Sequence, residues 1–413
     1  MNVEKTSVLL LALCALISVL APARAQQGPR IRALSEQEVT DLMVGAAIQG
    51  TRSSDTAVMI RQAQALLAAG KSFDIVSVDD LPNDWTIVTA AGGIGGGGAW
   101  PYVTERIKQQ NVPSVSNPTE IALRALSQHL GKTFNAVIRN EAAEATLNAF
   151  EVATAVDLPV VDACPAGRAK PEVEESLPFI NGISVTPAAL VTRWGDTIFL
   201  DKTVDDYRYE DIARAIAVGS GGGVSNARGV LSGRDVKRVT IRGALSEAIL
   251  FGRTVREAVA QGRDPIDALL KVSGAHKMFA GVVSKADEKG ARGFTWWDIE
   301  LQGSGAYSGH TYRIWVKNEN ILSWLDSKPD VMSPDLIYNL DPKTAEAISS
   351  NSLGGYPMGT EVVIIARPAP SPAWRTPKGI EVIGPRHFGF DFDYQPLEQI
   401  LKTRPKFGAH QPT

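Results

Sequence analysis

The chain is expected to fold as an α/β N-terminal domain with a largely parallel sheet, followed by a mainly β C-terminal domain with a few helices. Up to residue 200, short apolar segments alternate with segments of helical periodicity, and this alternation is typical of βαβ units. From Phe279 onward the segments are short, rich in aromatic and β-branched residues, and separated by Gly, Pro or Asp. Such spacing favours a small antiparallel barrel or sandwich.

Helix caps define the first elements of the N-terminal domain. Ser35 and Glu38 have the spacing of a capping box, so a helix should begin directly after Ser35. Gly70 should end the second helix, because glycine readily adopts the left-handed conformation that closes helices. We expect helices at 36–47, 57–69, 102–109, 120–130 and 142–156, and strands at 73–78, 85–91, 134–138 and 158–161.

The second half of the chain changes from helices to strands. Helices are expected at 209–218 and 245–261, and Pro265 should open a shorter one. Strands are expected at 236–242, 294–301, 310–317, 321–325, 336–340, 361–365 and 380–383. These elements place the two domains at residues 34–200 and 201–400, with a tether at 26–33 and a tail at 401–413.

The first 25 residues have the layout of a secretory signal peptide. Lys5 precedes an apolar run from Ser7 to Ala21, and Ala23-Arg24-Ala25 matches the small-residue pattern of a cleavage site. We therefore expect cleavage after Ala25, a periplasmic or secreted protein, and no membrane span in the mature chain. The alternative is an uncleaved anchor, although the apolar run is short for a membrane span.

Composition favours an ordinary globular protein. The net charge is −3, with 21% charged and 44% hydrophobic residues, and no basic segment indicates nucleic-acid binding. Of the two cysteines only Cys164 follows the expected cleavage site, so the mature chain can form no internal disulfide. The five histidines show no metal-ligand spacing, so any cofactor or metal is unknown from the sequence, and a homo-oligomer is compatible with it.

The segment 158–172 contains the first candidates for a catalytic site. It begins as a short apolar strand, which prolines and a glycine then interrupt. Asp162, Arg168 and Glu172 follow this strand, at the position where open α/β sheets bind ligands. We expect the three side chains to share one cleft with the glycine-rich loop 92–98. The alternative is an ion pair that only stabilises a turn.

The glycine run that begins at Gly93 follows an expected strand and matches the pattern G-x-G-x-x-G. Ala99-Trp100-Pro101 interrupts the helix that a dinucleotide site would need directly afterwards. The run is therefore interpreted as a close backbone approach to a neighbouring segment or to a small ligand. On this interpretation Gly93 and Gly95 are candidate substrate contacts.

Two segments of the C-terminal half add further candidates. Asn318-Glu319-Asn320 is either a hairpin turn, because Asn tolerates left-handed geometry, or a polar cluster that faces a cleft between the domains. The segment 384–396 combines glycines, prolines, acids and aromatics, and we expect it to pack against the body and line the site. The candidate substrate-binding residues here are Asn318, Asn320, Arg386 and Asp391.

A series of short motifs extends over most of the chain: Leu158-Pro-Val-Val-Asp-Ala, Gly167-Arg-Ala, Pro171-Glu172, Ser232-Gly-Arg, Gly243-Ala-Leu-Ser246, Gly293-Phe294, Asn318-Glu319-Asn320, Pro334-Asp-Leu-Ile337, Leu340-Asp341, Gly384-Pro-Arg and Phe388-Gly-Phe-Asp391. In this order the motifs resemble the S-methyl-thiohydantoin desulfurase family, from about Leu34 to about Gln395. The resemblance implies an α/β domain followed by a mainly β domain.

The resemblance also implies an activity, the hydrolytic removal of methanethiol from an S-methylated thiohydantoin, which leaves a hydantoin. Such a reaction needs a base for the attacking water and donors for the charge that develops. Asp162 or Glu172 would be the base, and Arg168 would hold the anionic part of the substrate. The sequence does not distinguish between the two carboxylates.

Three loops depart from the pattern of this family. Arg52-Ser53-Ser54-Asp55 replaces glycines after the first helix, Asn140-Glu141-Ala142-Ala143-Glu144 replaces a glycine-and-asparagine motif, and Cys164-Pro165 replaces Asp-Gly. Side chains block backbone approaches that glycine allows, so the substrate or the catalysis itself can differ. The alternative function is therefore an exported, non-catalytic protein that binds a small molecule with the same fold.

Overall fold

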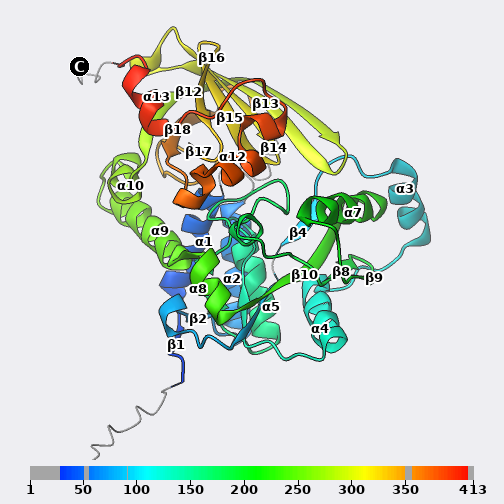
Figure 1. Cartoon of the computed structure of the whole chain (residues 1–413). Helices are drawn as coiled ribbons and strands as arrows, with labels where there is room; N and C mark the ends of the chain where they lie inside the picture. Colours follow the sequence, from blue (N-terminus) through cyan, green and yellow to red (C-terminus); the bar gives the residue numbers. More distant parts are fainter. Residues whose placement is uncertain (1–27, 51–54, 91, 349–355, 408–413) are drawn as a thin grey trace, which may run out of the picture.

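The computed structural model describes residues 28–50, 55–90, 92–348 and 356–407. An α/β part fills the lower half of Figure 1, and a strand-rich part in yellow and orange lies above it. The α/β N-terminal part and the mainly β C-terminal part expected from the sequence are both confirmed. The expected signal peptide and residues Arg52 to Ser54 lie outside the described residues.

The first sheet is mixed, with a parallel centre. Strands β2, β6, β5 and β3 are parallel neighbours, whereas the outer pairs are antiparallel. Short, buried apolar runs form the central strands, as expected for a sheet covered on both faces. The order is β1 (Ile31–Ala33), β2 (Asp74–Val76), β6 (Val160–Val161), β5 (Ala136–Ile138), β3 (Thr86–Thr89), β10 (Gly223–Ser232), β8 (Ala188–Thr192) and β9 (Thr197–Leu200), and β4 (Gly93–Gly95) also pairs with β10.

Helices cover both faces of this sheet. Val137 packs against the helices of one face, whereas its neighbours Ala136 and Ile138 face the opposite side. The first face is covered by α1 (Glu36–Gln49), α2 (Thr56–Ala68), α4 (Pro118–Leu130) and α5 (Ala145–Ala155), and the second by α7 (Asp206–Gly219) and α8 (Gly233–Val239). The capping box of Ser35 and Glu38 is present at the start of α1. Helices α3 (Pro101–Gln110) and α6 (Leu177–Ile180) lie in connecting segments.

Helix α9 (Ala244–Ala260) crosses α1 at very short range. A Cβ atom on Gly45 would lie 1.7 Å from the carbonyl oxygen of Ala248, and one on Gly252 would lie 1.9 Å from that of Asp41. Only glycine permits this approach. Beside the crossing, apolar side chains of α1 and α9 pack with those of α10 (Pro265–Ser273) and of the second sheet in one buried cluster.

The second sheet is a curled half-barrel of antiparallel strands. Its order is β16 (Lys328–Met332), β15 (Glu319–Leu325), β14 (Thr311–Lys317), β13 (Phe294–Gly303), β12 (His276–Ala291), β18 (Glu361–Arg367) and β17 (Leu336–Leu340). The predicted division at residue 200 separates β9 from α7, whereas the chain changes sheets between β10 and β12. The first sheet is thus completed by β10, a strand from the second half of the chain.

Two segments that we predicted as strands are mainly helical. Residues 233–239 form α8, which a capping box of Ser232 and Asp235 begins, and only β11 (Ile241–Arg242) pairs, with β7 (Ala163–Cys164). Residues 377–383 form α12 (Pro377–Ile383), with Thr376 as N-cap, and α13 (Leu397–Thr403) follows. In both places the cap outweighs the strand preference of the β-branched residues. Within the described part of the chain, no helix has the length and apolar character to cross a membrane.

Candidate functional site

A cavity of about 1080 Å³ lies where the two sheets meet. The first sheet contributes the ends of β3 and β5 and the glycine strand β4, and the second sheet contributes residues of β12, β13 and the β14–β15 turn. Its lining is strongly polar and includes Asn140, Glu141, Glu144, Lys170, Glu172, Arg193, Arg214, Arg228, Thr295 and Asn318. The size and the polar lining suit a small polar molecule.

The parallel strands explain why these residues meet. Strand β3 leads into Gly92, and β5 leads into Asn140 and Glu141, so both strands deliver their next residues to the same edge of the sheet. Strand β6, which lies within the segment 158–172, ends at the same edge.

The glycine run forms one wall of the cavity and packs on the second sheet. A Cβ atom on Gly96 would lie 2.4 Å from the carbonyl oxygen of Gly293, and one on Gly97 would lie 2.4 Å from Cα of Gly290. Gly95 pairs with Gly223 of β10, and a Cβ atom on Gly95 would lie 2.6 Å from the carbonyl oxygen of Gly222. The close approach expected for this run is therefore an approach to neighbouring backbone, and it leaves β4 as a thin wall.

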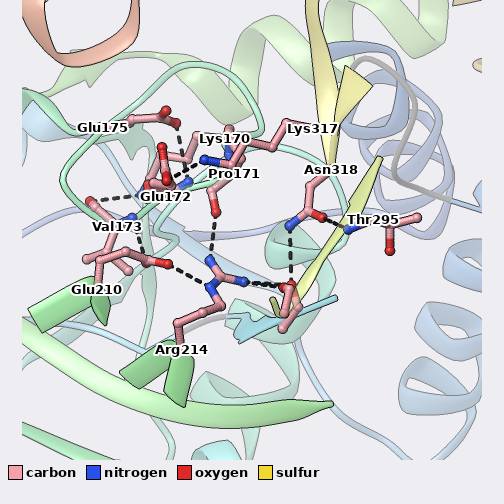
Figure 2. Close-up of polar contacts among 12 residues, drawn as sticks. Lys170, Pro171, Glu172, Val173, Glu175, Glu210, Arg214, Thr295, Lys317 and Asn318 are labelled. Carbon is pink, nitrogen blue, oxygen red and sulfur yellow. Dashed lines mark hydrogen bonds and ion pairs between the residues drawn. The ribbon is translucent and has the colours of Figure 1, made fainter. Parts of the chain in front are cut away.

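Arg214 of α7 holds four segments of the cavity wall together (Figure 2). Its Nη1 donates to the carbonyl oxygens of Gly95, at 2.8 Å, and Gly293, at 2.9 Å. Its Nη2 donates to the carbonyl oxygen of Pro171 at 2.8 Å, and its Nε donates to Glu210 Oε1 at 2.6 Å. The guanidinium is buried, so these contacts fix the position of the glycine strand relative to the loop that carries Glu172.

Asn318 connects the same glycine strand to the second sheet. It adopts a left-handed conformation, with φ of 54°, in the turn between β14 and β15. Its Nδ2 donates to the carbonyl oxygen of Gly95 at 3.2 Å, and its Oδ1 accepts from the backbone N–H of Thr295 at 2.8 Å (Figure 2). Both interpretations of this asparagine from the sequence apply, because it forms a turn and lines the cavity.

Glu172 lies in the cavity wall as an ionised carboxylate. Its Oε1 accepts from Lys317 Nζ at 2.5 Å, and its Oε2 lies 2.7 Å from His387 Nε2. Burial opposes ionisation, but the hydrogen bond with His387 and the charge of Lys317 together lower the pKa of Glu172 to about 2. A carboxylate with so low a pKa is a weak base at neutral pH.

Glu141 has the opposite electrostatic environment in the same cavity. Burial raises its pKa, against the charge of Lys170 and the hydrogen bond from the backbone N–H of Lys170, which is 2.7 Å long. Glu174, two positions after Glu172, is also buried, and burial and the charge of Glu172 raise its pKa to about 8. Carboxyl groups with pKa values pushed in opposite directions are typical of sites that use one as a base.

Some buried polar atoms of residues that line the cavity have no hydrogen-bond partner among the residues described. They include Nη1 of Arg228, whose side chain is nearly fully buried, and Oδ1 of Asn140. Both residues line the cavity, and Nδ2 of Asn140 donates to Glu141 Oε1 at 3.2 Å. The site therefore offers an unsatisfied donor and an unsatisfied acceptor close to Glu141.

Of the three predicted catalytic residues, only Glu172 lines this cavity. Asp162 instead holds the start of α9, where it accepts from the backbone N–H groups of Leu245, at 2.7 Å, and Ser246, at 3.1 Å. The N-cap of α9 is Gly243, which has no side chain to perform this function. The structure thus gives Asp162 a capping contact outside the cavity.

Arg168 is fully buried and connects the segment 158–172 to the second sheet. Its guanidinium donates to Ser333 Oγ at 2.9 Å and to the carbonyl oxygen of Asn320 at 3.1 Å. Arg168 is not among the residues that line the cavity. Its contacts are therefore those of a residue that joins two parts of the fold.

The structure separates the predicted substrate-binding residues. Gly93, Gly95 and Asn318 line the cavity. Asn320 is buried in β15 and donates to the carbonyl oxygen of Ile337, and Arg386 pairs with Asp391 and Asp393 on the surface. The predicted residues Asn320, Arg386 and Asp391 are therefore not among the cavity-lining residues.

Sequence reasoning missed Glu141, Arg214 and Arg228. Glu141 follows a predicted strand, so the strand-end argument could have selected it, but the sequence marked it only as a departure from a family pattern. Arg214 and Arg228 carried no local signal, because a charged residue on a helix or strand is usually exposed to solvent.

Comparisons with known proteins match both parts of the chain. The model of the S-Me-THD-like N-terminal domain matches residues 37–202, and that of the S-Me-THD-like C-terminal domain matches residues 204–397. A crystal structure of a protein from Chromobacterium violaceum has a similar fold, with a TM-score of 0.68 and 21% identity over 89% of this chain and 100% of that chain. A search of curated proteins found no match.

Proposed function

The chain belongs to the S-methyl-thiohydantoin desulfurase (S-Me-THD-like) family, and from this premise we propose that its cavity binds a five-membered cyclic amide and releases methanethiol from an S-methyl-thiohydantoin by hydrolysis. The substrate is a small, polar, planar ring. A cavity of about 1080 Å³ with charged and amide side chains can enclose such a ring together with a polar substituent.

One observation carries this proposal: Arg228 Nη1 and Asn140 Oδ1, which belong to residues lining the cavity, have no hydrogen-bond partner among the described residues, and the charge of Arg228 acts on Glu141. A cyclic amide presents a carbonyl acceptor and an N–H donor next to each other in one plane. The carbonyl oxygen would accept from Arg228, and the ring N–H would donate to Asn140. A buried polar group left without a partner is destabilising, so a ligand that satisfies both groups gains affinity.

In the proposed reaction Glu141 is the general base. Its raised pKa makes it a stronger base than Glu172, and it takes a proton from the water that attacks the ring carbon bearing the S-methyl group. The C–O bond forms as the π electrons of the ring C=N bond move to the nitrogen, and this nitrogen takes the remaining proton of the attacking water. The tetrahedral intermediate then collapses to the ring carbonyl, and the C–S bond breaks. The products are a ring carbonyl and methanethiolate, and the methanethiolate accepts from Glu141 the proton that Glu141 took from the water. Arg228 stabilises the negative charge that develops on the ring.

The test is methanethiol release from a panel of S-methyl-thiohydantoins. Glu141→Gln should lower kcat by about 100-fold or more, because general-base catalysis contributes at least that much. Glu151→Gln is the matched control, since burial also raises the pKa of Glu151 but this residue does not line the cavity. Equal rates in the wild type and Glu141→Gln would contradict the assignment of the base.

A non-catalytic binding protein is the second candidate function. One observation favours it, because Asn140 to Glu144, which replace a glycine-and-asparagine motif, line the cavity itself. Thermal melting with the same panel separates the two functions. A binding protein would melt at a higher temperature with a panel member and release no thiol, whereas the enzyme would release thiol with a turnover number above one.

We also propose that the protein is exported and cleaved after Ala25. The small residues Ala23 and Ala25 directly follow the apolar run, as in secretory signal peptides. The intact mass of protein from the extracytoplasmic fraction should correspond to a chain that starts at Gln26. A chain that retains Met1 in the cytosolic fraction would contradict export.

A further inference from the structure

Glu172, Glu175 and His387 form a compact cluster at the wall of the cavity. Oε2 of Glu172 lies 2.7 Å from Nε2 of His387, and Oε1 of Glu175 lies 3.9 Å from the same nitrogen. The three ligand atoms all lie within 4.8 Å of one another. Ligands of a tetrahedral zinc ion, with bonds of about 2.1 Å, are separated by about 3.4 Å, so this spacing suits one ion.

An independent feature of Glu175 indicates that the cluster has an additional partner. The Glu175 side chain is completely buried, and its Oε1 has no hydrogen-bond partner in the part of the chain that the structure describes. Buried carboxylates are normally paired with a cation or hydrogen-bonded. The unpartnered oxygen is the one nearest to the imidazole of His387, in the middle of the cluster.

The remaining carboxylate oxygens are held by other groups. Oε1 of Glu172 accepts from Lys317 Nζ at 2.5 Å, and Oε2 of Glu175 accepts from the backbone N–H of Glu172 at 3.4 Å. These contacts orient one oxygen of each carboxylate toward His387. Outer contacts of this kind are what hold metal ligands in position in known metal sites.

We propose that Glu172, Glu175 and His387 bind a divalent transition-metal ion. An imidazole nitrogen and two carboxylate oxygens suit ions such as Zn²⁺, whereas Ca²⁺ and Mg²⁺ prefer sites made only of oxygen. Three protein ligands leave at least one position of a four-coordinate ion open, as in catalytic rather than structural zinc sites. Since Glu172 lines the cavity, the ion would lie at its wall. Binding itself does not depend on the hydrolysis proposed above, because it can be measured without substrate.

The experiment is a zinc titration of the purified full chain. The protein is treated with a chelator, dialysed, and titrated with Zn²⁺ against a chromophoric chelator. We expect one equivalent to bind, and a melting temperature that rises with Zn²⁺. His387→Gln and Glu175→Gln should each weaken binding by more than about 100-fold, since losing even an outer contact costs 10–100-fold. Mg²⁺ at the same concentration should not raise the melting temperature.

The matched control is His310→Gln. Nδ1 of His310 lies 2.6 Å from Asp326 Oδ2, so this is also a histidine–carboxylate pair, but it belongs to no three-ligand cluster among the described residues. The His310→Gln variant should bind Zn²⁺ as the wild type does. Because Glu175 is buried, His387→Gln, at a partly exposed position, keeps the test valid if Glu175→Gln does not fold. A wild type that binds no Zn²⁺, or His387→Gln that binds it equally, would overturn the proposal.

Discussion

Nη1 of Arg214 lies 2.8 Å from the carbonyl oxygen of Gly95, although the two residues are separated by 119 positions in the sequence. The same guanidinium contacts Gly293 of the second sheet and Pro171 of the loop before Glu172. A single side chain therefore links the glycine wall, the loop and the second sheet around the cavity. Its charge is balanced by Glu210, 2.6 Å away on the same helix.

Arg214→Met should reduce both stability and turnover. Removing one partner of a buried ion pair leaves Glu210 uncompensated, which lowers the free energy of unfolding by about 3–5 kcal/mol. Arg208→Met on the same helix is the control, because its pair with Asp211 is exposed and contributes at most about 1 kcal/mol. Urea denaturation and methanethiol release measure the two effects. Similar losses in both variants would contradict the importance of the Arg214 contacts.

Arg168→Ala should be a stability variant. The sequence alone suggested that this change would abolish turnover and leave the fold intact, but the guanidinium is fully buried and donates to Ser333 Oγ and the carbonyl oxygen of Asn320. Each acceptor that loses its donor inside the protein costs about 1–3 kcal/mol, so we expect the two acceptors together to cost about 2–6 kcal/mol. Thermal melting provides the measurement. Arg242→Ala, at an exposed pair with Asp79, should change it little.

Asp162→Ala should weaken the start of α9. The carboxylate accepts from two backbone N–H groups there, and removing such a cap lowers the free energy of unfolding by about 0.5–2 kcal/mol. Turnover of the molecules that remain folded should be retained. If turnover were lost at an unchanged melting temperature, Asp162 would be a catalytic residue, as first predicted from the sequence.

The pH dependence of kcat/KM should report the ionisation of Glu141. A general base acts only when deprotonated, so activity should fall as the pH decreases through its pKa. Burial raises that pKa, and the acidic limb should therefore lie above the ordinary value of 4.5 for a glutamate. A profile that remains flat down to pH values below 4.5 would exclude Glu141 as the base.

Deprotonation of Glu141 should raise activity but lower the stability of the fold. Because the folded-state pKa of Glu141 is raised, the unfolded chain releases this proton at a lower pH than the folded chain, so its contribution to stability decreases as the pH rises through that window. Gln has no proton to release. Glu141→Gln should therefore gain stability relative to the wild type as the pH rises above 4.5, which chemical denaturation at several pH values would reveal.

Local sequence patterns were sufficient to predict most of the helices and strands. The capping box at Ser35, the apolar strands at 134–138 and 158–161, and the change to short aromatic strands after Phe279 all depend on near neighbours, and all appear in the structure. Local patterns failed at 236–242 and 380–383, where caps at Ser232 and Thr376 start helices. Both kinds of information were present in the sequence, but we gave the β-branched residues more weight than the caps.

The site depended on contacts between distant parts of the chain. Sequence reasoning placed a carboxylate, glycines and an asparagine at the site, and Glu172, Gly93, Gly95 and Asn318 do line the cavity. It could not distinguish Glu172 from Asp162, because both follow the same strand, and only the packing of α9 directs Asp162 to a helix end. The family resemblance was readable because it rests on ordered local motifs. The environments of Glu141, Arg214 and Arg228 could not be predicted from the sequence, since burial and electrostatic partners exist only after the two sheets have come together.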